Sequence, residues 1–274
     1  SFYTDDLKAA EKSLNTILEI DPKNPLALAY MGKLAADSEN FLRATKYVKE
    51  ALKYDPTNYD YYLDLGTYCR FQGKYSEAAE AWNKAVEIDP TYFLAYAYLA
   101  GSYDEQNEFA LALQNYHKVI ETNPKYFYAY ESTAILEYHL GNWAASRKYF
   151  AEAYKYSKSV SYQLMIAATY FKENNAFKAK EVLKPLLKTL NKDSLDYAMV
   201  RFYHDTYSFN AENSLVGKIN KEENRTQRGK MLFYMGLYYE LNGFSEKAVE
   251  YYTRVKSMNA PLFFEYRIAE WGLQ

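Results

Sequence analysis

The chain has 274 residues, a formal net charge of -2, 25% charged and 49% hydrophobic residues, which is typical of a folded protein that buries a core. Near-neutral charge with both signs interspersed argues against nucleic acid or an anionic membrane surface as a partner. The mainly apolar runs 93–100 and 164–171 are too short to span a membrane, and the single cysteine, Cys69, excludes an internal disulfide.

An X-Pro pair recurs at an unbroken spacing of 34 residues. The four pairs are Asp21-Pro22, Asp55-Pro56, Asp89-Pro90 and Asn123-Pro124. A period of this length indicates a helical-repeat architecture. Low Gly and Pro content points the same way, so we predict an all-α fold in which each unit of 34 residues is one helical hairpin.

Residues 1–24 fit only the second half of such a unit. Their apolar residues Leu7, Leu14, Ile17 and Leu18 lie on one face of a predicted helix and need a cover. Either upstream residues or a second copy of the chain provides it. The second option predicts a homo-oligomer that forms through the N-terminal helix.

Residues 25–193 form five predicted repeats, and their columns are chemically uniform. With proline as position 32, position 8 is small, as at Gly32 and Gly66, and position 24 is bulky, as at Trp82. A small residue lets two antiparallel helices approach closely, and a bulky one fills the remaining space at native density. Gly73, Gly141 and Gly243 occupy position 15, where we expect a positive φ to end the first helix.

The repeat pattern weakens toward the C-terminus. We interpret residues 194–228 as a degenerate helical hairpin with a polar loop, and residues 229–260 as the last repeat. Residues 261–274 carry Phe264, Ile268 and Trp271 at helical spacing, which predicts an amphipathic capping helix over the last hairpin.

These columns resemble the tetratricopeptide repeat family, strongly over residues 25–158 and with departures over 160–193 and 229–262. The resemblance implies a right-handed superhelical solenoid of antiparallel helix pairs, whose first helices line a concave groove that holds peptides. It also implies that positions 2, 5, 9, 12 and 13 face the groove. The candidate binding residues at or near these positions are Lys33, Asp37, Thr67, Arg70, Asp104, Tyr128, Glu131, Tyr138, His139 and Lys172.

The composition of this lining is mixed in charge and rich in tyrosine, of which the chain has 32. Lys33 and Arg70 are followed by Asp104, so the lysine, arginine and asparagine clamp that some family members use for a C-terminal carboxylate is not expected. Most tyrosines fall in core columns. The run Tyr126-Phe127-Tyr128 is too aromatic to be wholly buried, and we expect it to form one edge of a binding surface.

Catalytic and cofactor signals are weak. Gly66 and Gly73 do not have the spacing of a phosphate-binding loop, and both have repeat roles. The three histidines form no zinc pair, and Cys69 lies in a core column. We therefore expect no enzyme activity, no metal and no cofactor.

Two functions stay open at this stage. The first is a non-enzymatic scaffold that binds a peptide or partner subunit in the groove. The alternative is a small-molecule or glycan binder that uses the aromatic residues of the groove, and a deep apolar pocket would favour it. The composition and the start at Ser1 rather than Met resemble bacterial cell-envelope members, including periplasmic proteins and lipoproteins with a lipid anchor upstream. The periplasm or envelope is favoured over the cytoplasm.

Overall fold

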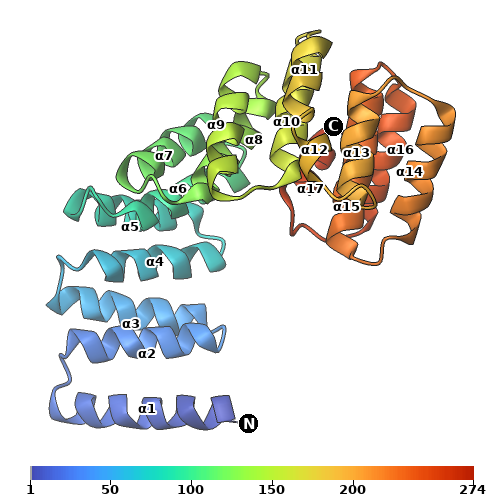
Figure 1. Cartoon of the computed structure of the whole chain (residues 1–274). Coiled ribbons are helices and arrows are strands. Elements are labelled where there is room, and N and C mark those ends of the chain that lie inside the picture. Colours follow the sequence, from blue (N-terminus) through green and yellow to red (C-terminus); the bar gives the residue numbers. More distant parts are fainter. Residues whose placement is uncertain (1) are drawn as a thin grey trace. The chain divides into compact units, whose positions relative to one another are not determined.

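A computed structural model describes residues 2–274, with side chains described from Leu7 onward. Within that range all regular elements are helices, and there are seventeen (Figure 1). The predicted all-α class, built from consecutive packed helical pairs, is confirmed. The chain divides into two compact units, Ser1–Ala129 and Tyr130–Gln274, which we call the N-terminal and C-terminal units.

The N-terminal unit contains three complete helical hairpins preceded by one helix. The helices are α1 (Phe2–Ile20), α2 (Pro25–Asp37), α3 (Phe41–Tyr54), α4 (Tyr59–Phe71), α5 (Tyr75–Ile88), α6 (Phe93–Glu105) and α7 (Phe109–Thr122). Helices α2, α4 and α6 are the first helices of their hairpins, and α1 packs against α2 as a second helix would. Asparagine side chains cap α2, α3 and α4 by accepting a backbone hydrogen bond from the first turn.

The close approach predicted at positions 8 and 24 is present. A Cβ atom on Gly66 of α4 would lie 2.3 Å from Trp82 Nε1 of α5, and Trp82 is fully buried. The Trp82 ring also stacks on Tyr98 of α6, with ring centroids 5.6 Å apart. The same fit recurs at Gly236, where a Cβ atom would lie 2.7 Å from the Tyr252 ring. The large residue therefore fills its own hairpin and can also contact the next one.

The predicted glycine stops are confirmed. Gly73, Gly141 and Gly243 have φ values of 73°, 77° and 80°. At the equivalent position of another repeat, Asn107 adopts φ 61°, because the turn needs a left-handed residue whichever side chain is present.

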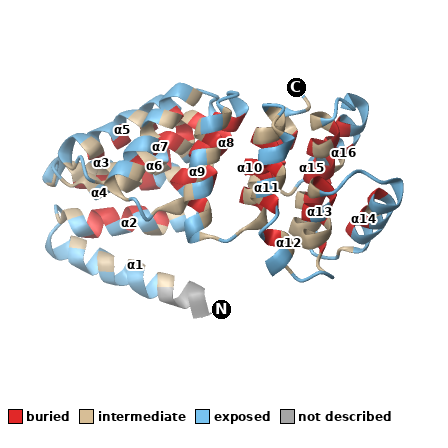
Figure 2. Cartoon of the chain, turned by 45° about the horizontal axis from the view of Figure 1, so that its top comes forward, coloured by how far each residue is buried: buried red, intermediate tan, exposed pale blue. Residues whose placement is uncertain are grey.

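The C-terminal unit follows the repeat less regularly. The division between the units falls inside α8 (Phe127–His139), and the later helices are α9 (Trp143–Tyr156), α10 (Val160–Lys172), α11 (Ala176–Leu183), α12 (Leu186–Thr189), α13 (Leu195–His204), α14 (Phe209–Lys221), α15 (Arg225–Leu241), α16 (Ser245–Ser257) and α17 (Phe264–Trp271). Burial is concentrated on the inner sides of these helices, most heavily in α10 and α15 (Figure 2).

Two local features depart from a regular repeat. Pro185 divides the second helix of its hairpin into α11 and α12, because proline has no N–H to donate to the preceding turn. Helix α15 begins at Arg225, four residues ahead of the predicted start of that repeat, and Asn224 caps it. Of the helices in residues 2–274, none has the length and apolar character needed to cross a membrane.

Candidate functional site

The predicted groove residues are distributed over both units. Those in the N-terminal unit are Lys33, Asp37, Thr67, Arg70, Asp104 and Tyr128, and those in the C-terminal unit are Glu131, Tyr138, His139 and Lys172. The two sets have different surroundings.

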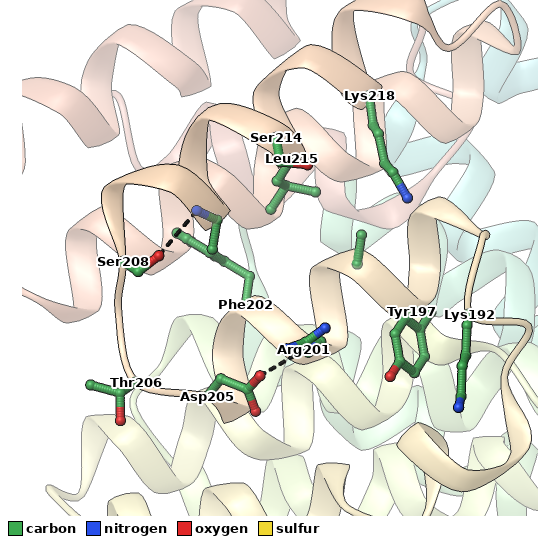
Figure 3. Close-up of a pocket in the computed structure, with 12 residues that line it drawn as sticks. Lys192, Tyr197, Arg201, Phe202, Asp205, Thr206, Ser208, Ser214, Leu215 and Lys218 are labelled. Atoms are coloured by element: carbon green, nitrogen blue, oxygen red, sulfur yellow. Dashed lines mark hydrogen bonds and ion pairs between the residues drawn. The ribbon is translucent and has the colours of Figure 1, made fainter.

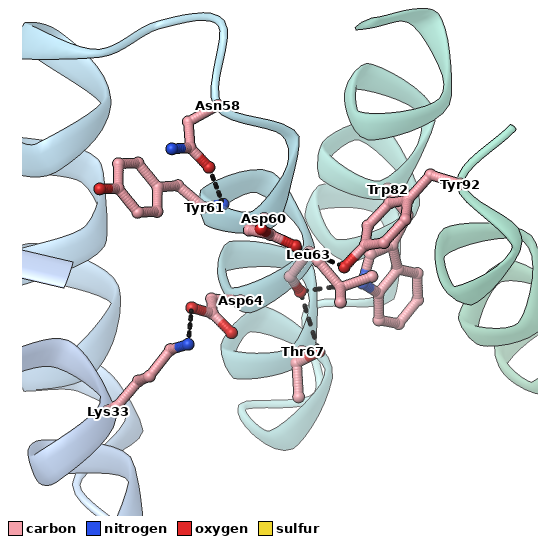
Figure 4. A network of polar contacts seen from close by, with 9 residues as sticks. All are labelled: Lys33, Asn58, Asp60, Tyr61, Leu63, Asp64, Thr67, Trp82 and Tyr92. Carbon is pink, nitrogen blue, oxygen red and sulfur yellow. Dashed lines mark hydrogen bonds and ion pairs between the residues drawn. The ribbon is translucent and has the colours of Figure 1, made fainter. Parts of the chain in front are cut away.

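In the N-terminal unit, the accessible side of α2, α4 and α6 forms what we call the first-helix face. Ion pairs link these helices across it. Lys33 Nζ of α2 lies 3.5 Å from Asp64 Oδ2 of α4, and the two side chains point toward each other (Figure 4). Arg70 of α4 binds Glu105 of α6 through two nitrogens, with Nε 3.0 Å from Oε2. Both cations of the face therefore have carboxylate partners on the next first helix.

Further hydrogen bonds are made by residues of α4. The Tyr92 hydroxyl donates to Asp60 Oδ1 at 2.6 Å, and Trp82 Nε1 donates to the Leu63 carbonyl at 3.2 Å (Figure 4). The Thr67 hydroxyl donates to the same carbonyl at 2.9 Å. Thr67 is therefore already satisfied within its own helix.

Aromatic side chains on the N-terminal unit remain accessible. The exposed fractions are 50% for Tyr30, 58% for Phe71, 37% for Tyr98 and 55% for Tyr128. Asp37 is also exposed, whereas Asp104 is buried, with 7% exposure. We therefore leave Asp104 out of the accessible surface.

The run Tyr126-Phe127-Tyr128 belongs to an aromatic edge at the starts of the first helices. Tyr126 contacts the ring of Phe93 at a centroid distance of 5.4 Å and that of Tyr128 at 5.7 Å. Tyr59 and Tyr92 form a similar contact at 4.7 Å. The expectation that this run is not wholly buried is confirmed, and its role as an edge of a binding surface stays a prediction.

In the C-terminal unit, the predicted groove residues contact other helices of the same chain. Glu131 accepts a 2.5 Å hydrogen bond from the Tyr162 hydroxyl, and burial raises the pKa of this carboxyl. Lys172 pairs with Glu240 of α15. The His139 ring stacks on Trp271 of α17 at a centroid distance of 4.0 Å.

Tyr138 lies inside this packing. Its exposed fraction is 6%, and its hydroxyl has no hydrogen-bond partner among the residues whose side chains are described. Burial raises its pKa well above the usual value. Tyr138 is therefore not available to a partner in this arrangement.

Helix α17 contacts several other helices of the C-terminal unit. It packs against α15 and α16, the last hairpin, and it also reaches α10, where Ser161 Oγ donates to Glu265 Oε1 at 2.5 Å. The Tyr234 hydroxyl of α15 donates to the same oxygen at 3.0 Å, and Glu265 has no exposed surface. Thus α17 is an internal part of the C-terminal unit.

The α17 contacts extend to aromatic rings of earlier helices. The Phe264 ring lies 5.8 Å from that of Phe150 and 6.0 Å from that of Tyr162, between centroids. The sequence predicts α17 as a helix from the spacing of its apolar residues. It does not reveal the contacts with α9 and α10, because no local signal links Glu265 to Ser161.

A surface cavity of about 300 Å³ lies between α13 and α14, in the segment where the repeat pattern is lost (Figure 3). Its apolar wall includes Phe202 and Leu215, and Lys218 extends from α14 toward α13. Arg201 Nε is 2.7 Å from Asp205 Oδ2, so this cation is paired within its own helical turn. None of the lining residues was predicted as a binding residue.

The surroundings of Cys69 agree with the core position predicted for it. The side chain is buried, and burial raises the pKa of its thiol, which disfavours the reactive thiolate. Among the side chains of residues 7–274, no group of three or more His, Cys, Asp or Glu is arranged to hold a metal ion.

The apolar face of α1 is only partly covered. Leu18 packs against the core formed by α2 and α3, whereas Ile17 and Ile20 are exposed. A homo-oligomer formed through this helix stays a prediction.

Comparison with known proteins agrees with the repeat pattern. The sequence model of the tetratricopeptide repeat family matches residues 31–93 and 98–160. Residues 31–93 and 98–160 are therefore tetratricopeptide repeats, and further helical pairs follow them in the chain. No curated protein sequence matches it significantly.

Several solved structures share the fold. MamA has 26% identity and a TM-score of 0.53, over 57% of this chain and 91% of its own. The C-terminal part of a TPR repeat-containing protein from Cytophaga hutchinsonii has 14% identity and a TM-score of 0.62, over 100% and 96% of the two chains. YrrB, described as a TPR protein with an unusual peptide-binding site, has 17% identity and a TM-score of 0.55, over 68% and 96%.

Proposed function

We propose that the chain is a non-enzymatic scaffold whose first-helix face, in the N-terminal unit, binds a peptide or a segment of a partner subunit. The observation that carries this proposal is the accessibility of aromatic rings on α2, α4 and α6. Tyr30, Phe71 and Tyr98 supply rigid contact area at a small entropic cost, and such rings are enriched at protein interfaces.

A comparison of how exposed the first helices are in each unit supports the choice of the N-terminal unit as the binding surface. In the C-terminal unit, Glu131, His139 and Lys172 are engaged by residues of α10, α17 and α15. In the N-terminal unit, the corresponding side of the hairpins keeps Asp37 and Tyr30 exposed. A solved relative by fold, YrrB, is described as having a peptide-binding site, which is consistent with the same use of the scaffold here.

Small-molecule or glycan binding by the same face is the alternative. It has less support, because Tyr30, Phe71 and Tyr98 line neither the cavity of about 300 Å³ around α13 and α14 nor the cavity of about 500 Å³ beside α4 and α5. Aromatic rings spread over three helices suit an extended peptide better than a compact ligand.

The test is selection of random 12-residue peptides on the immobilised full chain, followed by binding measurements with synthetic copies of the selected sequences. We expect replacement of Tyr30, Phe71 and Tyr98 by Ala to weaken binding at least about tenfold, since interface aromatics often contribute 1 kcal/mol or more each. The matched control replaces Leu42 and Leu111, which are exposed on the second helices α3 and α7. Equal loss in both variants, or no selected peptide, would contradict the proposal.

A further inference from the structure

The charge of the first helices in the N-terminal unit differs from that of the chain as a whole. Helix α2 carries one cation and one carboxylate, α4 carries one cation and two carboxylates, and α6 carries two carboxylates and no cation. Together these three helices hold two cations and five carboxylates. The adjacent second helix α3 has the opposite balance, with four cations and one carboxylate. Helices α5 and α7 add two cations and four carboxylates, so the second helices together hold six cations and five carboxylates, and the net negative charge lies on the first helices.

Both cations on the first helices are neutralised internally. Lys33 Nζ lies 3.5 Å from Asp64, and Arg70 is held by two hydrogen bonds to Glu105. A guanidinium that is bound through two nitrogens has little capacity left for a carboxylate of a partner. Both cations of these three helices therefore already have a carboxylate partner, which weakens their attraction for an acidic peptide.

Two carboxylates on these helices have no cationic partner among the described residues. Asp37 is exposed near the end of α2, and Asp60 in the first turn of α4 accepts only a neutral hydroxyl, that of Tyr92 at 2.6 Å. Asp64 differs from them, because its Oδ2 atom is buried and its charge is already paired with Lys33. Asp37 and Asp60 can each accept hydrogen bonds from an incoming ammonium or guanidinium group.

The accessible rings strengthen the same preference. Within the chain, Lys33 already lies over the Tyr30 ring at 5.6 Å from its centroid, and Arg70 lies 5.8 Å from that of Phe71. These contacts show that the rings of this face can accept a cation on their π-systems. Carboxylates and tyrosine rings side by side are a suitable environment for lysine and arginine.

We infer that the first-helix face selects a peptide in which lysine or arginine residues alternate with apolar or aromatic ones. This inference rests on the proposed function and specifies its partner class. Cationic side chains pair with Asp37 and Asp60, while apolar side chains contact Tyr30, Phe71 and Tyr98. Electrostatic complementarity of this kind fixes the choice of partner and makes the affinity dependent on salt.

The experiment uses the same peptide selection on the full chain and compares the selected pool with the starting library. We expect Lys plus Arg to be enriched at least about twofold and Asp plus Glu to be depleted. For a selected peptide, the variant Asp37→Asn with Asp60→Asn should raise Kd about three- to tenfold at 50 mM NaCl. At 300 mM NaCl the difference between wild type and variant should shrink.

The matched control replaces two carboxylates on the second helix α5, Glu80→Gln with Glu87→Gln, and it should leave Kd within about twofold. Selected peptides that are acidic or neutral, and whose binding depends on Tyr30 and Phe71, would overturn the inference but not the proposed function. Selection of no peptide, or binding that ignores these rings, would overturn the proposed function itself.

Discussion

At the scale of single residues, Gly66 shows why the repeat pattern is physically constrained. A Cβ atom at this position would lie 2.3 Å from Trp82 Nε1, and the fully buried indole is held by its hydrogen bond to Leu63. We expect Gly66→Ala to lower the free energy of unfolding by about 1–3 kcal/mol through overpacking. Denaturant unfolding monitored by circular dichroism measures this change.

Gly101 provides the matched control, because it lies inside helix α6 and a Cβ atom there would contact nothing within 4 Å. Gly101→Ala should be neutral or raise the free energy of unfolding by up to about 1 kcal/mol, since alanine favours helix. Equal effects of the two substitutions would mean that helix propensity, and not the contact with Trp82, determines the outcome.

At the scale of helices, the sequence predicts most of the regular hairpins but few of the irregular ones. Position columns identify Gly66 and Trp82 as partners because a repeat mainly contacts itself and its neighbours. Pro185 in the sequence indicates the break between α11 and α12, because proline interrupts a helix. The bond between Ser161 and Glu265 joins residues 104 positions apart, and it depends on the path of the intervening helices rather than on a periodic pattern.

For the candidate site, the sequence predicts which residues lie on the first helices, but it does not predict their partners or their burial. The family positions place Lys33 and Arg70 on first helices, but they do not reveal that Asp64 and Glu105 neutralise them. Nor do they separate the exposed Asp37 from the buried Asp104. These differences arise from side-chain packing between hairpins, which a column of residue types does not encode.

The buried carboxyl of Glu265 in α17 leads us to expect that the stability of the fold depends on pH. Burial raises the pKa of this carboxyl in the folded chain, against the opposing influence of Lys230 and of the bonds from Ser161 and Tyr234. The unfolded chain, with a glutamate pKa of about 4.3, therefore ionises first, and this residue's stabilising contribution falls as pH rises above that value.

The variant Glu265→Gln cannot ionise and keeps an acceptor oxygen for Ser161. Between pH 4 and pH 7 we expect its Tm to rise relative to that of the wild type, with any packing cost appearing as a constant offset. Thermal unfolding at several pH values gives this difference. A difference that is independent of pH would mean that Glu265 has the same pKa in the folded and unfolded chains.

At the scale of the whole molecule, the two compact units lead to different expectations for loss of the C-terminal segment. In the C-terminal unit, α17 buries Glu265 against α10 and α15, and Gly229 leaves room for the Phe263 ring, which a Cβ atom would meet at 2.5 Å. Deletion of residues 261–274 would expose this polar and aromatic surface. In the N-terminal unit, α2–α5 form their own core.

We therefore expect the deletion to accelerate amide hydrogen exchange in α10 and α15 by about tenfold or more, while exchange in α2–α5 stays close to wild type. Hydrogen exchange with peptide-level mass spectrometry resolves the two regions. Leu262→Ala is the control, because this side chain in the same segment is 84% exposed and its loss should change neither region. Faster exchange throughout the chain after the deletion would show that both units unfold as one cooperative structure. Unchanged exchange in α10 and α15 would show that α17 contributes little to the stability of these two helices.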